Sequence, residues 1–173
     1  MSFSIRATIR DLLAPEHQIS CSSCLWQQGM AELKRRGKGH RESGAFILGW
    51  REGNKRRIAK YIYYDDLDPH CLDSGIIVLD GSVVGRLWKI CRKTGFVVVA
   101  DVHTHAGRPY QSKIDQVNPM IGVAGHIAII VPGLAMQKVK ASELGVYEYR
   151  GRHQWQPHLD REAARFFYIG RWS

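Results

Sequence analysis

The 173-residue chain lacks any apolar run approaching the roughly 18 residues at which a membrane-spanning helix becomes a candidate. Its first residues also lack the apolar core of a secretory signal peptide. We therefore expect a cytoplasmic protein without a membrane partner. Internal repeats, low-complexity segments and long linkers are missing too, and 45% hydrophobic residues suffice for one sizeable core. The sequence predicts a single domain over residues 1–173.

Cysteine is scarce, with four in the chain. A reducing compartment would keep them as free thiols. Cys21 and Cys24 have the C-x-x-C spacing of a zinc or redox site, but no second pair with that spacing exists to complete a structural zinc site. Cys71 follows His70, and nothing in that spacing requires a metal. We interpret the four cysteines as packed or exposed thiols. Metal binding or redox activity at Cys21 and Cys24 is the alternative.

Acidic residues are outnumbered by basic ones, which gives a formal net charge of +9. This balance favours acidic partners, nucleic acid included. The basic residues gather in two segments, 34–41 and 55–57. A helix C-terminus and an exposed hairpin turn would account for them, because basic side chains offset the helix dipole. No RNA-binding aromatic-glycine signature or helix-turn-helix pattern is present, so nucleic-acid binding is kept as an incidental property.

Apolar periodicity predicts alternating helices and strands, and hence an α/β protein. Helices are expected from Ser22 or Ser23 to Gly37–Gly39, over Asp80–Gly95, and within the tail Asp160–Ser173. Strands are expected at Phe46–Trp50, Arg57–Tyr64, Phe96–His105 and Gly125–Pro132, and near Val139, Val146 and Tyr149. The acidic segment Asp65–Gly75 is typical of a surface loop. In the helix Asp80–Gly95, one apolar face is expected to comprise Val83, Val84, Leu87, Trp88 and Cys91.

The end of the strand Phe96–His105 carries the clearest chemistry. His103 and His105 are two residues apart, and residues i and i+2 of a strand point to the same face. Ser112 begins a Ser-x-x-Asp turn that could fold Asp115 back onto both imidazoles. Two imidazole nitrogens and one carboxylate oxygen make a three-ligand zinc site with an open fourth position, which is typical of catalytic zinc.

A catalytic zinc of this kind also needs a general base that is not itself a ligand. Glu42, at the start of an apolar strand, is the candidate, although taken alone it is equally typical of a solvated strand end. The Ser112-x-x-Asp115 pattern likewise matches a helix cap, which is the alternative role for that hydroxyl. His126 is interpreted as a core or edge histidine with a hydrogen-bond partner rather than as a ligand.

Glu42 with its following strand, the His103-x-His105 pair and Ser112-x-x-Asp115 together resemble the JAMM metallopeptidases, also called MPN+ or JAB. The resemblance spans Glu42 to Asp115 by motif. Two positions depart from the family pattern. Ala106 stands where the family usually has proline, and the six residues between His105 and Ser112 are one fewer than usual.

The resemblance implies a single MPN/JAB-like α/β domain with a curved, mixed, mostly antiparallel sheet flanked by helices. It implies Zn²⁺ held by His103, His105 and Asp115, with Glu42 as the acid/base and Ser112 as the stabiliser of the tetrahedral intermediate.

Members of this family cleave peptide or isopeptide bonds after ubiquitin-like proteins. A compact, bacterial-type, deubiquitinase-like member is therefore expected to cleave after the C-terminal glycine of a ubiquitin-like partner. E1-like or E2-like conjugation enzymes are further candidate partners, in a bacterial conjugation or anti-phage system. Two alternatives stay open: an inactive MPN-type scaffold, against which the complete ligand set argues, and a basic nucleic-acid-binding protein.

Overall fold

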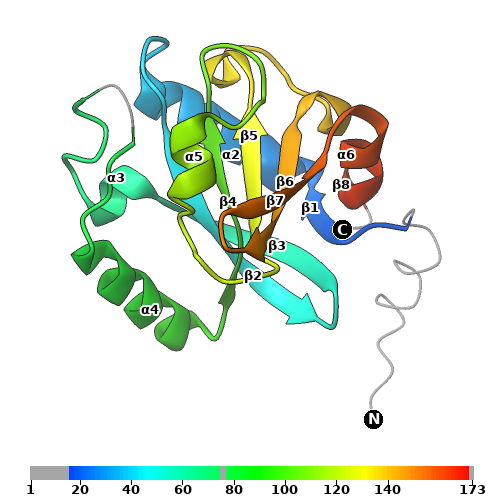
Figure 1. Ribbon diagram of the computed structural model, residues 1–173, viewed down its shortest axis with the longest axis horizontal. Helices are drawn as coiled ribbons and strands as arrows, with labels where there is room; N and C mark the ends of the chain where they lie inside the picture. The colour runs from blue at the N-terminus through cyan, green and yellow to red at the C-terminus, as the bar shows by residue number, and fades with distance from the viewer. Residues whose placement is uncertain (1–15, 75–76, 172–173) are drawn as a thin grey trace.

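The computed structural model of the protein describes residues 16–74 and 77–171, which build one layered α/β structure (Figure 1). Its strands are β1 (Ile19–Ser22), β2 (Gly44–Glu52), β3 (Lys55–Tyr63), β4 (Val97–Thr104), β5 (Ile127–Val131), β6 (Gly145–Gly151), β7 (Gln154–His158) and β8 (Phe167–Gly170). The α-helices are α2 (Ser23–Gly37), α3 (Tyr64–Leu67), α4 (Ser82–Thr94), α5 (Lys113–Val117) and α6 (Asp160–Phe166), and the 3₁₀ turns are η1 (Gly133–Ala135) and η2 (Ala141–Glu143).

All eight strands join one mixed sheet in the order β7-β6-β5-β4-β2-β3-β1-β8. Strand β2 pairs antiparallel with β3 and β4, and β5, β6 and β7 form an antiparallel meander. Strand β4 runs parallel to β5, and β1 runs parallel to both β3 and β8. The expected curved, mixed, mostly antiparallel sheet flanked by helices is confirmed.

Helices cover both faces of the sheet, which explains why β2 is buried and free of polar side chains from Gly44 to Gly49. Ala45 and Ile47 join the core under α2 and α6, whereas Phe46 and Leu48 join the core under α3 and α4. Successive strand residues point to opposite faces, so a strand covered on both sides must be continuously apolar. Each large side chain buried in this way contributes roughly 1.5–3 kcal/mol.

The predicted first helix and hairpin are confirmed. Ser22 is the N-cap of α2, and its hydroxyl accepts a hydrogen bond from the backbone N–H of Leu25 at 3.3 Å. The β2–β3 hairpin turns at Gly53, whose φ of +57° is the left-handed region that glycine adopts without strain. Helix α4 also forms where expected, and Asp80 Oδ1 accepts a hydrogen bond from the Ser82 N–H at its start.

The buried face of α4 is narrower than expected. Val83, Leu87 and Cys91 are buried, but Val84 is 41% and Trp88 is 39% exposed. Successive helix residues are rotated by about 100°, so only the strict i, i+4, i+8 stripe reaches the sheet. The five apolar residues therefore share one side of α4, but only Val83, Leu87 and Cys91 among them are buried.

The segment Asp65–Gly75 is also not a plain surface loop. It begins within α3, and Leu67, Cys71 and Leu72 are buried in the core under α4. The acidic side chains Asp65 and Asp66 pair with Arg36 of α2, so much of the segment's charge is neutralised within the chain. Gly75 itself lies outside the described residues.

Other differences concern the chain ends and the edge strands. Val139 lies in no strand, although Val146 and Tyr149 lie in β6 as expected. The C-terminal helix stops at Phe166, and the chain continues as β8 beside β1. The short strands β1, β7 and β8 were not predicted, because four or five residues carry too little periodicity. Trp172 lies outside the described residues, and so does the segment 1–15, on which the prediction about a signal peptide depends.

Cys21, Cys71 and Cys91 are buried, Cys24 is exposed, and all four are free thiols as predicted. Burial raises the pKa of the Cys21 thiol to about 12. Across residues 16–74 and 77–171, no helix combines the length and the apolar character that crossing a bilayer requires. The cytoplasmic location and the single-domain span of residues 1–173 stay predictions.

Candidate metal centre

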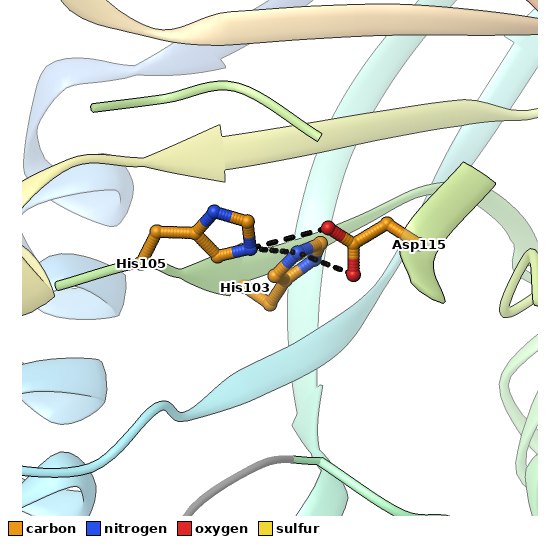
Figure 2. Close-up of side chains that lie close together, drawn as sticks. All are labelled: His103, His105 and Asp115. Atoms are coloured by element: carbon orange, nitrogen blue, oxygen red, sulfur yellow. Dashed lines mark hydrogen bonds and ion pairs between the residues drawn. The ribbon is translucent and has the colours of Figure 1, made fainter. Parts of the chain in front are cut away.

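His103 and His105 project from the C-terminal end of β4 and face each other (Figure 2). Their Nε2 atoms are 3.0 Å apart. The backbone here is held by β5, since His103 pairs with Ile130 and the His105 N–H donates to the carbonyl of Val131 at 2.9 Å. The strand's period of two thus places both rings on one face, as the sequence indicated.

Asp115 approaches both rings from the short helix α5, which lies across the front of β4 in Figure 1. Its Oδ1 is 3.6 Å from His103 Nε2, and its Oδ2 is 3.3 Å from His105 Nε2. Ser112 caps this helix: its hydroxyl accepts from the Asp115 N–H at 3.2 Å, and its own N–H donates to Asp115 Oδ2 at 2.6 Å. Ser112 therefore does have the predicted capping role, and its hydrogen bonds to Asp115 orient the Asp115 carboxylate.

The loop between His105 and Ser112 is tied down by β6. The Tyr147 hydroxyl donates to the carbonyl of Pro109 at 3.1 Å, and the Gln111 N–H lies 3.4 Å from the same hydroxyl. A β-carbon at Gly145 would collide with the Pro109 carbonyl, so only glycine allows this close approach. These contacts hold the loop that brings Asp115 back to the histidines.

Glu42 lies beside the two histidines, just before β2. Its Oε1 is 3.9 Å from His105 Nε2, beyond hydrogen-bond distance. The adjacent Ser43 fixes this position, because its N–H donates to Thr104 Oγ1 at 3.0 Å and its hydroxyl donates to the Leu33 carbonyl at 2.8 Å. Thr104, the middle residue of the His-x-His pair, thus points away from the histidines and anchors Glu42. Sequence reasoning missed this contact.

The three facing side chains fit a metal ion. One ligand atom from each of His103, His105 and Asp115 can be chosen so that all three lie within 4.8 Å of one another. Two imidazole nitrogens and a carboxylate oxygen are a donor set that zinc accepts. The Asp115 carboxyl is partly buried, which raises its pKa, but the two imidazoles outweigh burial and hold that pKa well below its usual range. An ionised Asp115 is the form that can bind a cation.

The site opens into a cavity of about 430 Å³. The cavity is lined by the apolar side chains of Ile77, Ile114 and Met120, which come from three separate segments. Ala106 and Gly107, which have little or no side chain, also line it. The pKa of the Glu42 carboxyl is raised, because burial outweighs the attraction of His105 and His103. A carboxyl with a raised pKa beside a cavity is suited to both accepting and donating a proton.

Behind His103 lies a buried polar group that the sequence analysis did not connect with the site. The ring of His126 contacts Asp101, with Nε2 2.5 Å from Oδ1. His126 is thus a core histidine with a partner, as predicted. Asp101, a carboxylate inside the apolar run of β4, was the overlooked feature in the sequence.

No protein-family model matches the chain. A curated protein of Sinorhizobium fredii, named "Probable metalloprotease y4jG", is 22% identical over 125 residues, covering 72% of this chain and 77% of that protein. The solution structure of protein DSY2949 from Desulfitobacterium hafniense has a TM-score of 0.63 at 15% identity, covering 88% of this chain and 94% of that one. The second likeness concerns the fold alone.

Proposed function

We propose that the protein is a zinc metallopeptidase of the JAMM type, which cleaves after the C-terminal glycine of a ubiquitin-like protein. The observation that carries the proposal is the convergence of His103, His105 and Asp115, with Glu42 beside them but beyond bonding distance. Three ligands and a separate carboxylate are the set that metal-assisted hydrolysis requires. The Sinorhizobium relative, named a metalloprotease, supports the same chemistry.

The roles of the residues follow from their positions. His103, His105 and Asp115 would hold the zinc, which when bound lowers the pKa of water and polarises the scissile carbonyl. Glu42 would take the proton of the attacking water on Oε1 and pass it to the departing amine as the C–N bond breaks. The Ser112 hydroxyl accepts from the Asp115 N–H, so its own hydrogen remains able to donate to the developing oxyanion.

The cavity supports a narrow substrate tail. Ile77, Ile114 and Met120 line it beside the histidines, and we infer that a tail with small side chains would reach the metal most easily. Gly-Gly is the extreme case. Ile114 lines this cavity and is more than half exposed, and exposed apolar groups are available to the folded body of a partner. The segment 65–74 is a further candidate for that contact.

Removal of the Ser112 hydroxyl should separate its two roles. Ser112→Gly keeps a tolerated N-cap residue but has no side-chain donor, and we expect kcat to fall roughly 100-fold or more with zinc content unchanged. Ser112→Ala should show the same loss in kcat and also lower the free energy of unfolding by about 1 kcal/mol. The measurements are steady-state kinetics and chemical denaturation. Near-normal kcat in Ser112→Gly would leave only the capping role.

Substrate recognition is tested by comparing kcat/KM for a full ubiquitin-like fusion with that for its isolated tail peptide. We expect a loss of at least 100-fold for the peptide, because the folded body supplies contact area that offsets the ordering of a flexible tail. Mass spectrometry of the products should place the cut directly after the terminal glycine. Equal kcat/KM values would point to a general endopeptidase, and no cleavage of either substrate by zinc-loaded protein would point to an inactive scaffold.

A further inference from the structure

Asp101 is an acidic side chain inside the protein core. It lies in the centre of β4, it is 2% exposed, and its neighbours Ala100 and Val102 are fully buried. An ionised carboxylate in such a place is destabilising by several kcal/mol unless other groups compensate its charge. Its position two residues before His103 puts both side chains on the same face of the strand.

Three polar side chains surround this carboxylate. His126 Nε2 lies 2.5 Å from Oδ1, and the Tyr64 hydroxyl donates to Oδ2 at 3.3 Å. His103 Nδ1 lies 3.8 Å from the same Oδ2, a distance for an ion pair rather than a hydrogen bond. All of these residues are buried, so water does not screen their interactions.

The two nitrogens of His103 have different surroundings. Nε2 faces His105 and Asp115, whereas Nδ1 is buried and has no hydrogen-bond partner among residues 16–74 and 77–171. A neutral imidazole that binds a metal through one nitrogen must carry its proton on the other. The carboxylate of Asp101 is the charged group next to that second nitrogen.

We propose that Asp101 is a positioning residue of the metal centre, which keeps the proton of His103 on Nδ1 and so presents the Nε2 lone pair to the metal. His126 holds the Asp101 carboxylate in place from the opposite side. This inference rests on the proposed function, because it takes His103 as a ligand. The inference adds a second role for β4. The end of the strand supplies the ligand His103, and the buried middle of the strand supplies Asp101, which orients that ligand.

A purely structural role is the competing explanation. The same network could simply satisfy buried polar atoms and stabilise the sheet. The two explanations differ in metal affinity: a residue that orients a ligand affects the dissociation constant for zinc by roughly 10–100-fold. A residue that only stabilises the fold changes the dissociation constant for zinc no more than a substitution at a neighbouring buried residue does.

Zinc affinity is therefore measured by chelator competition on the full chain. Asp101→Asn keeps the size of the side chain but removes its charge, and its Kd for zinc should rise roughly 10–100-fold. Tyr64→Phe is the matched control, since it removes a hydrogen bond to the same carboxylate oxygen and leaves the charge beside His103. Its Kd should stay within about threefold of the wild-type value. Equal Kd values for Asp101→Asn and Tyr64→Phe would overturn the proposal.

A second measurement needs neither metal nor variant. Long-range ¹⁵N–¹H NMR of the metal-free wild-type protein, recorded at a pH at which the ring is neutral, reports which nitrogen of His103 carries the proton. We expect the proton on Nδ1, in slow exchange with water; a proton on Nε2 would overturn the proposal even if Asp101→Asn failed to fold. Wild-type protein that binds no zinc would overturn the proposed function, whereas wild-type protein that binds zinc while Asp101→Asn and Tyr64→Phe show equal Kd values would overturn only the role of Asp101.

Discussion

Replacing Glu42 by glutamine is expected to lower kcat by roughly 10²–10⁴-fold, the usual contribution of a positioned general base. Glutamine keeps the size of the side chain and removes the group that accepts the proton. The zinc content should stay at the wild-type level, because Glu42 Oε1 is 3.9 Å from the nearest histidine nitrogen and does not belong to the cluster of facing ligand atoms. Steady-state kinetics and metal analysis on the same preparation test both statements.

Glu52→Gln is the matched control, since Glu52 is an exposed glutamate at the far end of β2. Its kcat and zinc content should equal those of the wild type. Loss of zinc from Glu42→Gln would make Glu42 a ligand and refute the assigned role. Retained activity in that variant would require another base, and no other carboxylate besides Asp115 lines the described cavity.

The second large effect is on the metal itself. The double variant His103→Ala/His105→Ala should fall from one zinc per chain to none, because only the Asp115 carboxylate would remain of the three facing ligands. Burial lowers the pKa of His103, but Asp101 and Asp115 outweigh burial and raise it to about 9. Zinc must therefore displace a proton from this ring, and affinity should increase as the pH rises toward that value. All variants are compared at one pH for this reason.

His70→Ala controls for loss of histidine in general. The His70 side chain is 88% exposed and pairs with Asp73 on the surface, and neither residue lines the cavity. Its zinc content should match that of the wild type, as measured by elemental analysis after dialysis. Stoichiometric zinc in the His103→Ala/His105→Ala protein would place the metal elsewhere and remove the basis of the proposed function.

Most of the regular structure could be predicted from local patterns. The helix from Ser23 and the hairpin at Gly53 follow from an N-cap residue and a turn residue that act within a few positions of themselves. The edge strands could not be predicted in this way. Strand β8 pairs with β1 across nearly the whole chain, and no local pattern encodes a partner so far away in sequence.

Burial was harder to predict than secondary structure. Val84 and Trp88 are apolar and lie on a well-predicted helix, yet they are 41% and 39% exposed. Cys71 and Leu72 lie in an acidic, turn-rich stretch, yet they are buried in the core. In each case the decision depends on which element packs above the residue, and composition within a short window does not contain that information.

The sequence by itself determined the chemistry available to this protein. His103 and His105 share a face because any strand has a period of two, and the Ser-x-x-Asp pattern caps a helix because of its local hydrogen bonds.

Only the tertiary structure decided what surrounds those residues. The pairing of β2 with β4 carries Glu42 to His105, and Tyr147 of β6 holds the loop that returns Asp115. The packing of β4 beside β5 joins His126 to Asp101 behind the first histidine. The physical reason is common to all three: each contact joins residues distant in sequence, whose approach is set by sheet order and core packing rather than by local conformation.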